Sequence, residues 1–121
     1  LATTYSTTTN GAWVNTGIAV TVTTHGEPVF VSLTGHMLMT ADFVGLAVRR
    51  PGAATDIAGA FEEGYDYALW GPTDKTLTIS GVDLTAPAGS NTYQVWLYVT
   101  DSGSASYLWN TNLSVLEVNS Q

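Results

Sequence analysis

The chain has 121 residues, a length that suits one domain with a single hydrophobic core. Apolar residues make up 45% and charged residues only 11%, which is too apolar for intrinsic disorder and leaves Ser and Thr to supply much of the wet surface. Three Lys and Arg against ten Asp and Glu give a net charge of -7, which disfavours nucleic acid and anionic membranes as partners. Cysteine is absent, so disulfides, thiol nucleophiles and Cys-rich zinc sites are excluded, and no apolar run approaches the ~20 residues of a membrane-spanning helix.

Residues 1–11 (LATTYSTTTNG) precede the first apolar pattern and are expected to form an N-terminal extension or linker. From there the apolar pattern has a period of two, which is typical of strands with one buried face. The segments 18–24 (IAVTVTT) and 28–35 (PVFVSLTG) alternate in this way, and Pro28 stands where its missing N–H is least harmful. Further strands are predicted at 43–49, 56–61, 66–70, 76–80, 93–99, 105–109 and 113–118.

Turn-forming clusters of Gly, Pro, Asn, Asp and Ser separate these runs: THGEP, RRPGAAT, WGPTDK, APAGSN and TDSGS. Their spacing is that expected of a sandwich or barrel. We find no helical pattern and no internal repeat of the ~20–50 residues that propellers and solenoids use. The sequence therefore predicts an all-β fold: one antiparallel β-sandwich domain of eight to nine strands over residues 12–119, followed by a tail at 120–121.

The strand predicted at 93–99 (YQVWLYV) carries large apolar side chains on both faces. If every second residue from Tyr93 faces the sandwich interior, Trp96 and Tyr98 must point away from it. A large exposed apolar patch usually marks a contact with another molecule, and aromatic residues are enriched in such interfaces. The alternative is that the segment 101–110 of the same chain folds over both rings.

Three stretches resemble a known family in strand order and spacing, over about residues 12 to 119: AWVNTGIAVTVTTHGEPVFVSLTGHM, FVGLAVRRPG and TYQVWLYVTDSGSASYLWNTNLSVLEV. They are similar to the jelly-roll modules at the C-termini of bacteriophage tail fibres and of collagen-like phage or bacterial surface proteins. Those modules resemble in architecture the trimeric heads of the tumour necrosis factor and complement families. The resemblance implies a jelly-roll fold, a homotrimer, and a place on a virion surface or otherwise outside the cell.

The resemblance also implies where the copies meet and what the assembly does. It places the strand 93–99 near a threefold axis, with NLSVLEV beside it in the same sheet. The implied interface residues are Trp96, Tyr98, Tyr107 and Trp109. If the segment 101–110 folds back instead, Tyr107 and Trp109 would cover Trp96 and Tyr98 within the same chain. The implied function is that of a non-enzymatic tail-fibre, head-fibre or decoration module that contacts a host receptor or glycan. A purely structural trimerisation or capsid-decoration domain is the alternative.

Carboxylates and aromatic rings gather in residues 55–71 (TDIAGAFEEGYDYALWG). Rings can stack on a sugar and acids can accept from its hydroxyls, so a receptor or glycan site is predicted at Tyr65, Asp66, Tyr67 and Trp70. Three alternatives stay open. Glu62 and Glu63 could solvate a loop after a strand, while Arg49 or Lys75 pairs with one of the acids. The acids Asp56, Glu62, Glu63 and Asp66 could instead bind calcium. Two carboxylates held about 5 to 9.5 Å apart could also hydrolyse a glycoside.

Catalytic motifs are harder to find. The two histidines are His25, in a predicted turn where surface exposure is expected, and His36. HExxH, GxSxG and glycine-rich phosphate-loop patterns are absent, and no spacing joins a nucleophile to a base and an orienting acid. The chain is therefore predicted to be non-enzymatic, without a catalytic residue, metal or cofactor, and a small glycoside hydrolase is a remote alternative.

Overall fold

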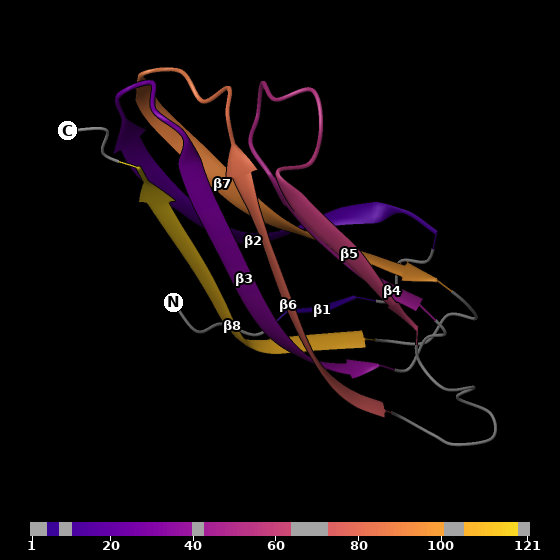
Figure 1. The fold of residues 1–121 in the computed structure, drawn as a ribbon. Helices are drawn as coiled ribbons and strands as arrows, with labels where there is room; N and C mark the ends of the chain where they lie inside the picture. Colours follow the sequence, from indigo (N-terminus) through magenta and orange to yellow (C-terminus); the bar gives the residue numbers. More distant parts are fainter. Residues whose placement is uncertain (1–4, 8–10, 40–42, 64–72, 101–105, 119–121) are drawn as a thin grey trace.

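The computed structural model describes residues 5–7, 11–39, 43–63, 73–100 and 106–118 (Figure 1). Within these ranges every regular element is a strand and each ladder is antiparallel, which confirms the predicted all-β fold. The strands are β1 (Tyr5–Thr7), β2 (Trp13–Thr24), β3 (Val29–Met39), β4 (Phe43–Arg49), β5 (Ala58–Glu63), β6 (Thr73–Asp83), β7 (Gly89–Thr100) and β8 (Ser106–Glu117). The described residues contain no helix, and so none that could cross a membrane.

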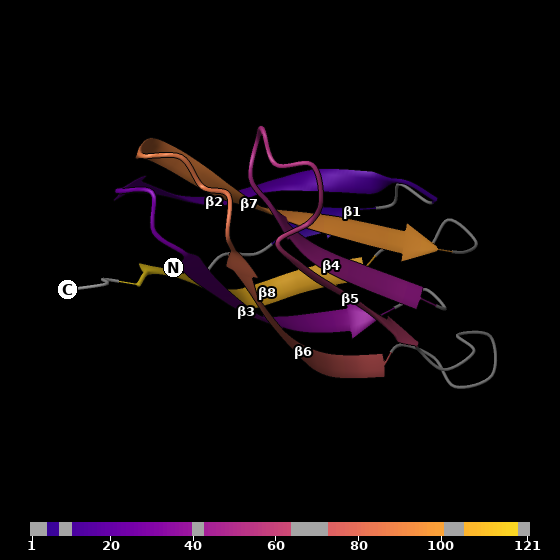
Figure 2. The ribbon, with the colours of Figure 1, turned by 45° about the horizontal axis from the view of Figure 1, so that its top comes forward.

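The strands form two four-stranded sheets that face each other as a sandwich (Figure 2). We call the sheet with the order β1-β8-β3-β6 sheet A, and the sheet with the order β2-β7-β4-β5 sheet B. Most consecutive strands lie in opposite sheets, and only β4 and β5 pair directly across their connection. That connection, residues 50–57, stands out from the sandwich in both views.

The core lies between the sheets and follows the predicted period of two. In β3 the side chains of Val29, Val31 and Leu33 are buried, while the intervening side chains point outward. In β7 the same alternation buries Tyr93 and Val95, among others. Because each strand contributes every second side chain to one shared core, the face of each strand could be predicted from the sequence.

Strand boundaries differ from the prediction where a ladder absorbs an irregularity. The predicted strands 105–109 and 113–118 are one strand, β8, whose register with β3 shifts between Thr34 and His36. A bulge of this kind accommodates an extra residue without ending the strand. The short strand β1 lies within the segment expected to be an extension and pairs with β8, and the strand predicted at 66–70 lies outside the described residues.

One expectation of sheet membership is wrong. The segment NLSVLEV was expected beside the strand 93–99 in the same sheet, but β8 belongs to sheet A and β7 to sheet B. Both edges of β7 are already hydrogen-bonded, one to β2 and the other to β4, so β7 has no edge left for β8. β8 pairs instead with β3 and β1.

Candidate functional site

An arginine lies between two tryptophans on the outer face of sheet B. Trp96 and Tyr98 point out of the sandwich, as predicted, and both are half-buried. Trp13 of β2 is the cross-strand neighbour of Tyr98, and their ring centroids lie 5.4 Å apart. The guanidinium carbon of Arg49 lies 4.9 Å from the ring centroid of Trp13 and 4.7 Å from that of Trp96. Each such cation–π contact contributes about 0.5–1 kcal/mol at a partly exposed site.

The rings of β7 therefore have partners within their own chain. Sequence reasoning considered the segment 101–110 for this role and missed Trp13 and Arg49, because the contact depends on the register of β2 and β4 against β7. The predicted interface residues are divided: Trp96 and Tyr98 lie on sheet B, whereas Tyr107 and Trp109 belong to β8 in sheet A. For those two residues the structure describes only the backbone.

A groove of about 500 Å³ opens beside this cluster. One wall consists of outward side chains of sheet B, Arg49, Gln94 and Trp96, and the other is the loop 50–56. Arg49 Nε donates to Asp56 Oδ1 at 2.7 Å across the groove, and both side chains stay accessible, at 31% and 40%. This pair bears out the alternative in which Arg49 neutralises an acid of the acidic stretch.

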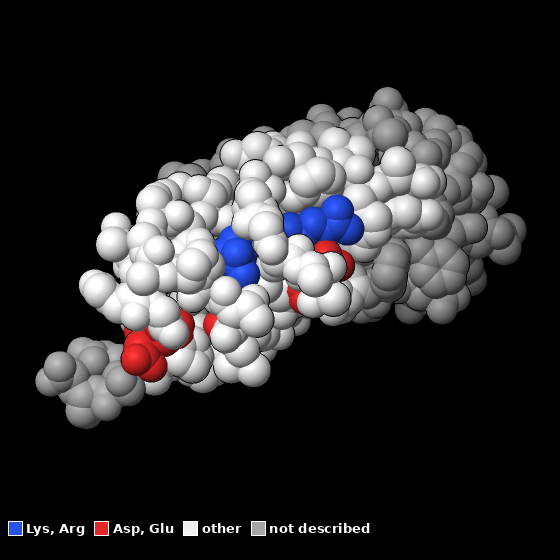
Figure 3. Space-filling model, turned by 90° about the horizontal axis from the view of Figure 1, so that it is seen from above, with Lys and Arg blue, Asp and Glu red and all other residues white. Residues whose placement is uncertain are grey.

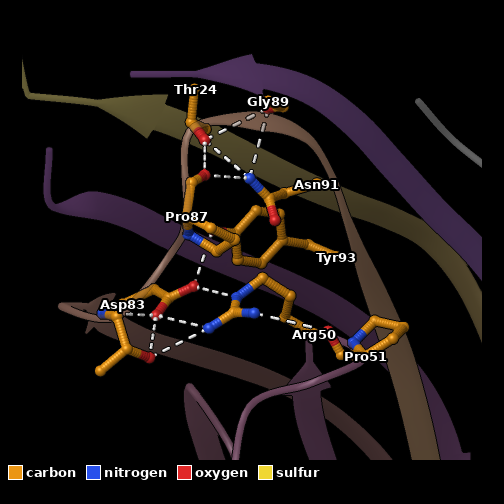
Figure 4. Close-up of polar contacts among 9 residues, drawn as sticks. Thr24, Arg50, Pro51, Asp83, Pro87, Gly89, Asn91 and Tyr93 are labelled. Carbon is orange, nitrogen blue, oxygen red and sulfur yellow. Dashed lines mark hydrogen bonds and ion pairs between the residues drawn. The ribbon is translucent and has the colours of Figure 1, made fainter. Parts of the chain in front are cut away.

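The next residue, Arg50, points into the protein, where it forms a buried ion pair with Asp83 (Figure 4). Its Nε donates to Asp83 Oδ2 at 2.5 Å, and its Nη2 donates to Thr85 Oγ1 at 3.0 Å. The Tyr93 hydroxyl donates to the same carboxylate at 2.8 Å. The two charged side chains are only 5% and 1% exposed, so their charges are matched almost entirely by each other and by these hydrogen bonds.

The network shifts the pKa of each of its titratable groups. Burial by itself would raise the pKa of Asp83, but the hydrogen bonds from Arg50, Tyr93 and the Thr85 backbone N–H together lower it. The hydrogen bond to Asp83 raises the pKa of Arg50, against the effect of burial. Burial, followed by the bond to Asp83, raises the pKa of Tyr93. At neutral pH the network therefore holds one carboxylate, one guanidinium and one neutral phenol.

These contacts fix the loop that walls the groove. The loop begins at the anchored Arg50, whose carbonyl accepts from Ala53 N–H at 3.0 Å. It ends where Ile57 N–H donates to the Val48 carbonyl at 2.9 Å. The Arg49–Asp56 pair joins the two ends of the loop on the outer side.

The described basic side chains, Arg49 and Arg50, are surrounded by acidic and uncharged surface in Figure 3.

A second polar cluster closes the same end of the sandwich (Figure 4). Asn91 Nδ2 donates to Thr24 Oγ1 at 2.6 Å and to the Pro87 carbonyl at 2.8 Å. Thr24 Oγ1 in turn donates to the Pro87 carbonyl at 2.7 Å. The cluster joins the paired ends of β2 and β7 to the connection before β7, and both side chains are buried.

The side chains of the other predicted site residues lie outside what the structure describes. Tyr65, Asp66, Tyr67 and Trp70 lie outside the described residues. Of Glu62 and Glu63, at the end of β5, only the backbone is described. No group of three or more metal-binding side chains occurs among the residues whose side chains are described.

The exposed His25 confirms the expectation for a histidine in a turn. Its ring Nδ1 lies 2.8 Å from Glu117 Oε1, and its backbone N–H donates to Glu117 Oε2 at 2.5 Å. The backbone N–H of Glu27 donates to the same carboxylate at 3.2 Å. The hydrogen bond from the backbone N–H of His25 is the main cause of a lowered pKa of Glu117, and the hydrogen bond with the His25 ring lowers this pKa further. Together these contacts join the turn between β2 and β3 to the end of β8.

No protein-family model matches the chain, and no curated protein matches its sequence.

Proposed function

We propose that the chain is a non-enzymatic jelly-roll module of a virion or other extracellular surface, which assembles as a homotrimer and contacts a receptor or glycan on a host. The observation that carries the assembly is an outer face of sheet A on which no described side chain is Asp, Glu, Lys or Arg, in a protein with a net charge of -7. The strand orders β1-β8-β3-β6 and β2-β7-β4-β5 support the jelly roll, because its two Greek keys place consecutive strands in opposite sheets. The trimeric state and the virion setting rest on the resemblance to phage tail-fibre modules.

The outer face of sheet A begins with a row of exposed apolar side chains. Phe30 of β3 is the cross-strand neighbour of Val82 in β6 and of Leu116 in β8. These three side chains are 50%, 39% and 69% exposed. Leu84, directly after β6, is 76% exposed. Contiguous apolar surface of this kind marks a contact with another molecule more often than scattered single residues do.

The next two rows beyond Phe30 are polar but uncharged. Ser32 lies between Ser80 and Ser114, and Thr34 lies between Thr78 and Asn112. None of the outward-facing side chains described on β3, β6 and β8 is Asp, Glu, Lys or Arg. On other surfaces of this acidic chain, carboxylates would repel those of a second copy. On the outer face of sheet A, no described carboxylate would meet one of the second copy. A second copy is therefore the partner that the face fits best.

The interface proposed on sheet A differs from the interface residues predicted from the sequence. Trp96 and Tyr98 are covered by Trp13 and Arg49, and they do not require a partner chain to shield them. Tyr107 and Trp109 belong to β8, within sheet A. We propose sheet A, and not the outer face of sheet B, as the surface through which copies meet.

The test places a carboxylate in the middle of the proposed interface. Ser32→Glu should convert the assembly to monomer in sedimentation at low micromolar concentration, because the new charges would be buried against each other and without cations. The side chain is exposed in the single chain, so the fold should survive, which far-UV circular dichroism can check.

Thr21→Glu is the matched control. Thr21 is exposed on the outer face of sheet B beside Thr92, so this variant adds the same charge to the opposite side of the sandwich. It should keep the mass of the unmodified protein. Equal masses for the two variants, whether both assembled or both monomeric, would contradict the assignment of the interface to sheet A.

A further inference from the structure

The groove on sheet B has the features of a preformed site. Small-molecule sites are concave and largely formed before binding, with a few polar groups that fix orientation. Here the loop 50–56 is held at both ends by the Arg50–Asp83 pair and the Arg49–Asp56 pair. A groove whose walls are fixed in advance loses little conformational freedom when a ligand binds.

The groove offers donors and acceptors side by side. Arg49 presents a guanidinium, which only donates, and Asp56 presents a carboxylate, which only accepts when ionised. Gln94 lies beside them, and its Oε1 accepts from Trp96 Nε1 at 3.2 Å, which fixes the amide next to the ring. A hydroxyl group both donates and accepts, so neighbouring hydroxyls of one molecule match this set.

The charge of the groove selects against an anion. Asp56 already neutralises Arg49, and Asp83 neutralises Arg50, the second basic residue of the lining. The protein as a whole carries a net charge of -7, which repels acidic ligands. The methyl groups of Ala53 and Ala54 and the Trp96 ring add apolar surface to the lining, suited to the C–H faces of a sugar.

We propose that this groove binds a neutral sugar ring, with Arg49, Asp56 and Gln94 bonding to its hydroxyls. The inference rests on the proposed contact with a host surface, and it places that contact on the loop 50–56 and β7. The strand wall of the groove belongs to sheet B, whereas the proposed interface belongs to sheet A. The loop 50–56 also borders Val82 and Leu84, so the groove lies beside the edge of the proposed interface.

The test is an array of immobilised neutral oligosaccharides printed beside sialylated and uronic-acid counterparts. The unmodified protein should bind members of the neutral set and ignore the acidic set. Asp56→Asn and Gln94→Ala should each weaken binding at least tenfold, since each removes an acceptor or an amide from the groove. Thermal melting of each variant checks that the fold persists.

Thr23→Ala is the control on the same sheet. Thr23 is exposed on β2 opposite Ser90, and neither residue lines the groove, so binding should not change. Binding confined to acidic glycans, or the absence of glycan binding, would overturn the inference. Neutral-glycan binding that survives both groove variants would overturn the groove as its site and leave the proposed host contact standing. A monomeric mass of the unmodified protein, measured separately by sedimentation, would instead overturn the proposed assembly.

Discussion

Arg50→Met is expected to lower the free energy of unfolding by about 3–5 kcal/mol, because it leaves the buried Asp83 carboxylate without its cation. Asp83 is 1% exposed and would keep only the hydrogen bonds from Tyr93 and Thr85. Methionine fills much of the space of the arginine stem, so the loss should reflect the uncompensated charge more than a cavity. Urea denaturation at one fixed protein concentration measures it.

Arg49→Met is the matched control, since it makes the same substitution one residue earlier. It removes an exposed ion pair and two partly exposed cation–π contacts, so the expected loss is about 1–3 kcal/mol and smaller than that of Arg50→Met. Similar losses for the two variants would contradict the assignment of the stabilising charge pair to Arg50 and Asp83.

The pH dependence of stability gives a second signature of the same network. The folded pKa of Asp83 is lowered, so its contribution is fully present above the unfolded value of about 3.9 and is lost as pH falls through the folded value. The folded pKa of Tyr93 is raised, so its contribution is fully present below about 10 and is lost as pH rises through the folded value. Asp83→Asn should flatten the acid side of the stability profile.

Gly81→Val is expected to destabilise the fold by roughly 3 kcal/mol or more, through steric overlap in a packed interior. Gly81 lies in β6 opposite Val31. A Cβ atom there would overlap the Ile57 carbonyl oxygen and come within 3.2 Å of Ala58 Cβ. Since the obstacle is backbone, relief requires the start of β5 to move away from β6, and thermal or urea unfolding should report the loss.

Gly59→Ala tests the same reasoning where space is available. A Cβ atom at Gly59 would lie 3.5 Å from the Leu46 carbonyl oxygen and 3.7 Å from Ala47 Cβ, which are ordinary contacts. The expected change is within about 1 kcal/mol, and alanine restricts the unfolded chain more than glycine does. If Gly81 tolerated valine as well as Gly59 tolerates alanine, the close approach of β5 to β6 would be contradicted.

What the sequence predicted well is local. Alternation along 18–24, 28–35 and 93–99 assigned the inward faces of these strands, because a period of two depends only on neighbours in the chain. The strand at 43–49 has the predicted bounds. The break expected between 105–109 and 113–118 did not appear, since pairing with β3 continues across the irregularity.

What the sequence could not predict depends on pairing between distant segments. Trp13 meets Tyr98 only because β2 pairs with β7, and Arg50 meets Asp83 across the interior from another sheet. Alternation along the strand places the neighbours Arg49 and Arg50 on opposite faces, but it does not indicate that Arg50 would meet a carboxylate of the other sheet. The placement of β8 in sheet A likewise follows from which strand edges are already occupied.

Sedimentation equilibrium of the unmodified protein at low micromolar concentration tests the central claim most directly. The apolar row on the outer face of sheet A, with Phe30 and Leu116 exposed, predicts self-assembly, and the resemblance to trimeric phage modules predicts a single species of about three times 12.8 kDa. A homogeneous species of 12.8 kDa under the same conditions would contradict the proposed assembly.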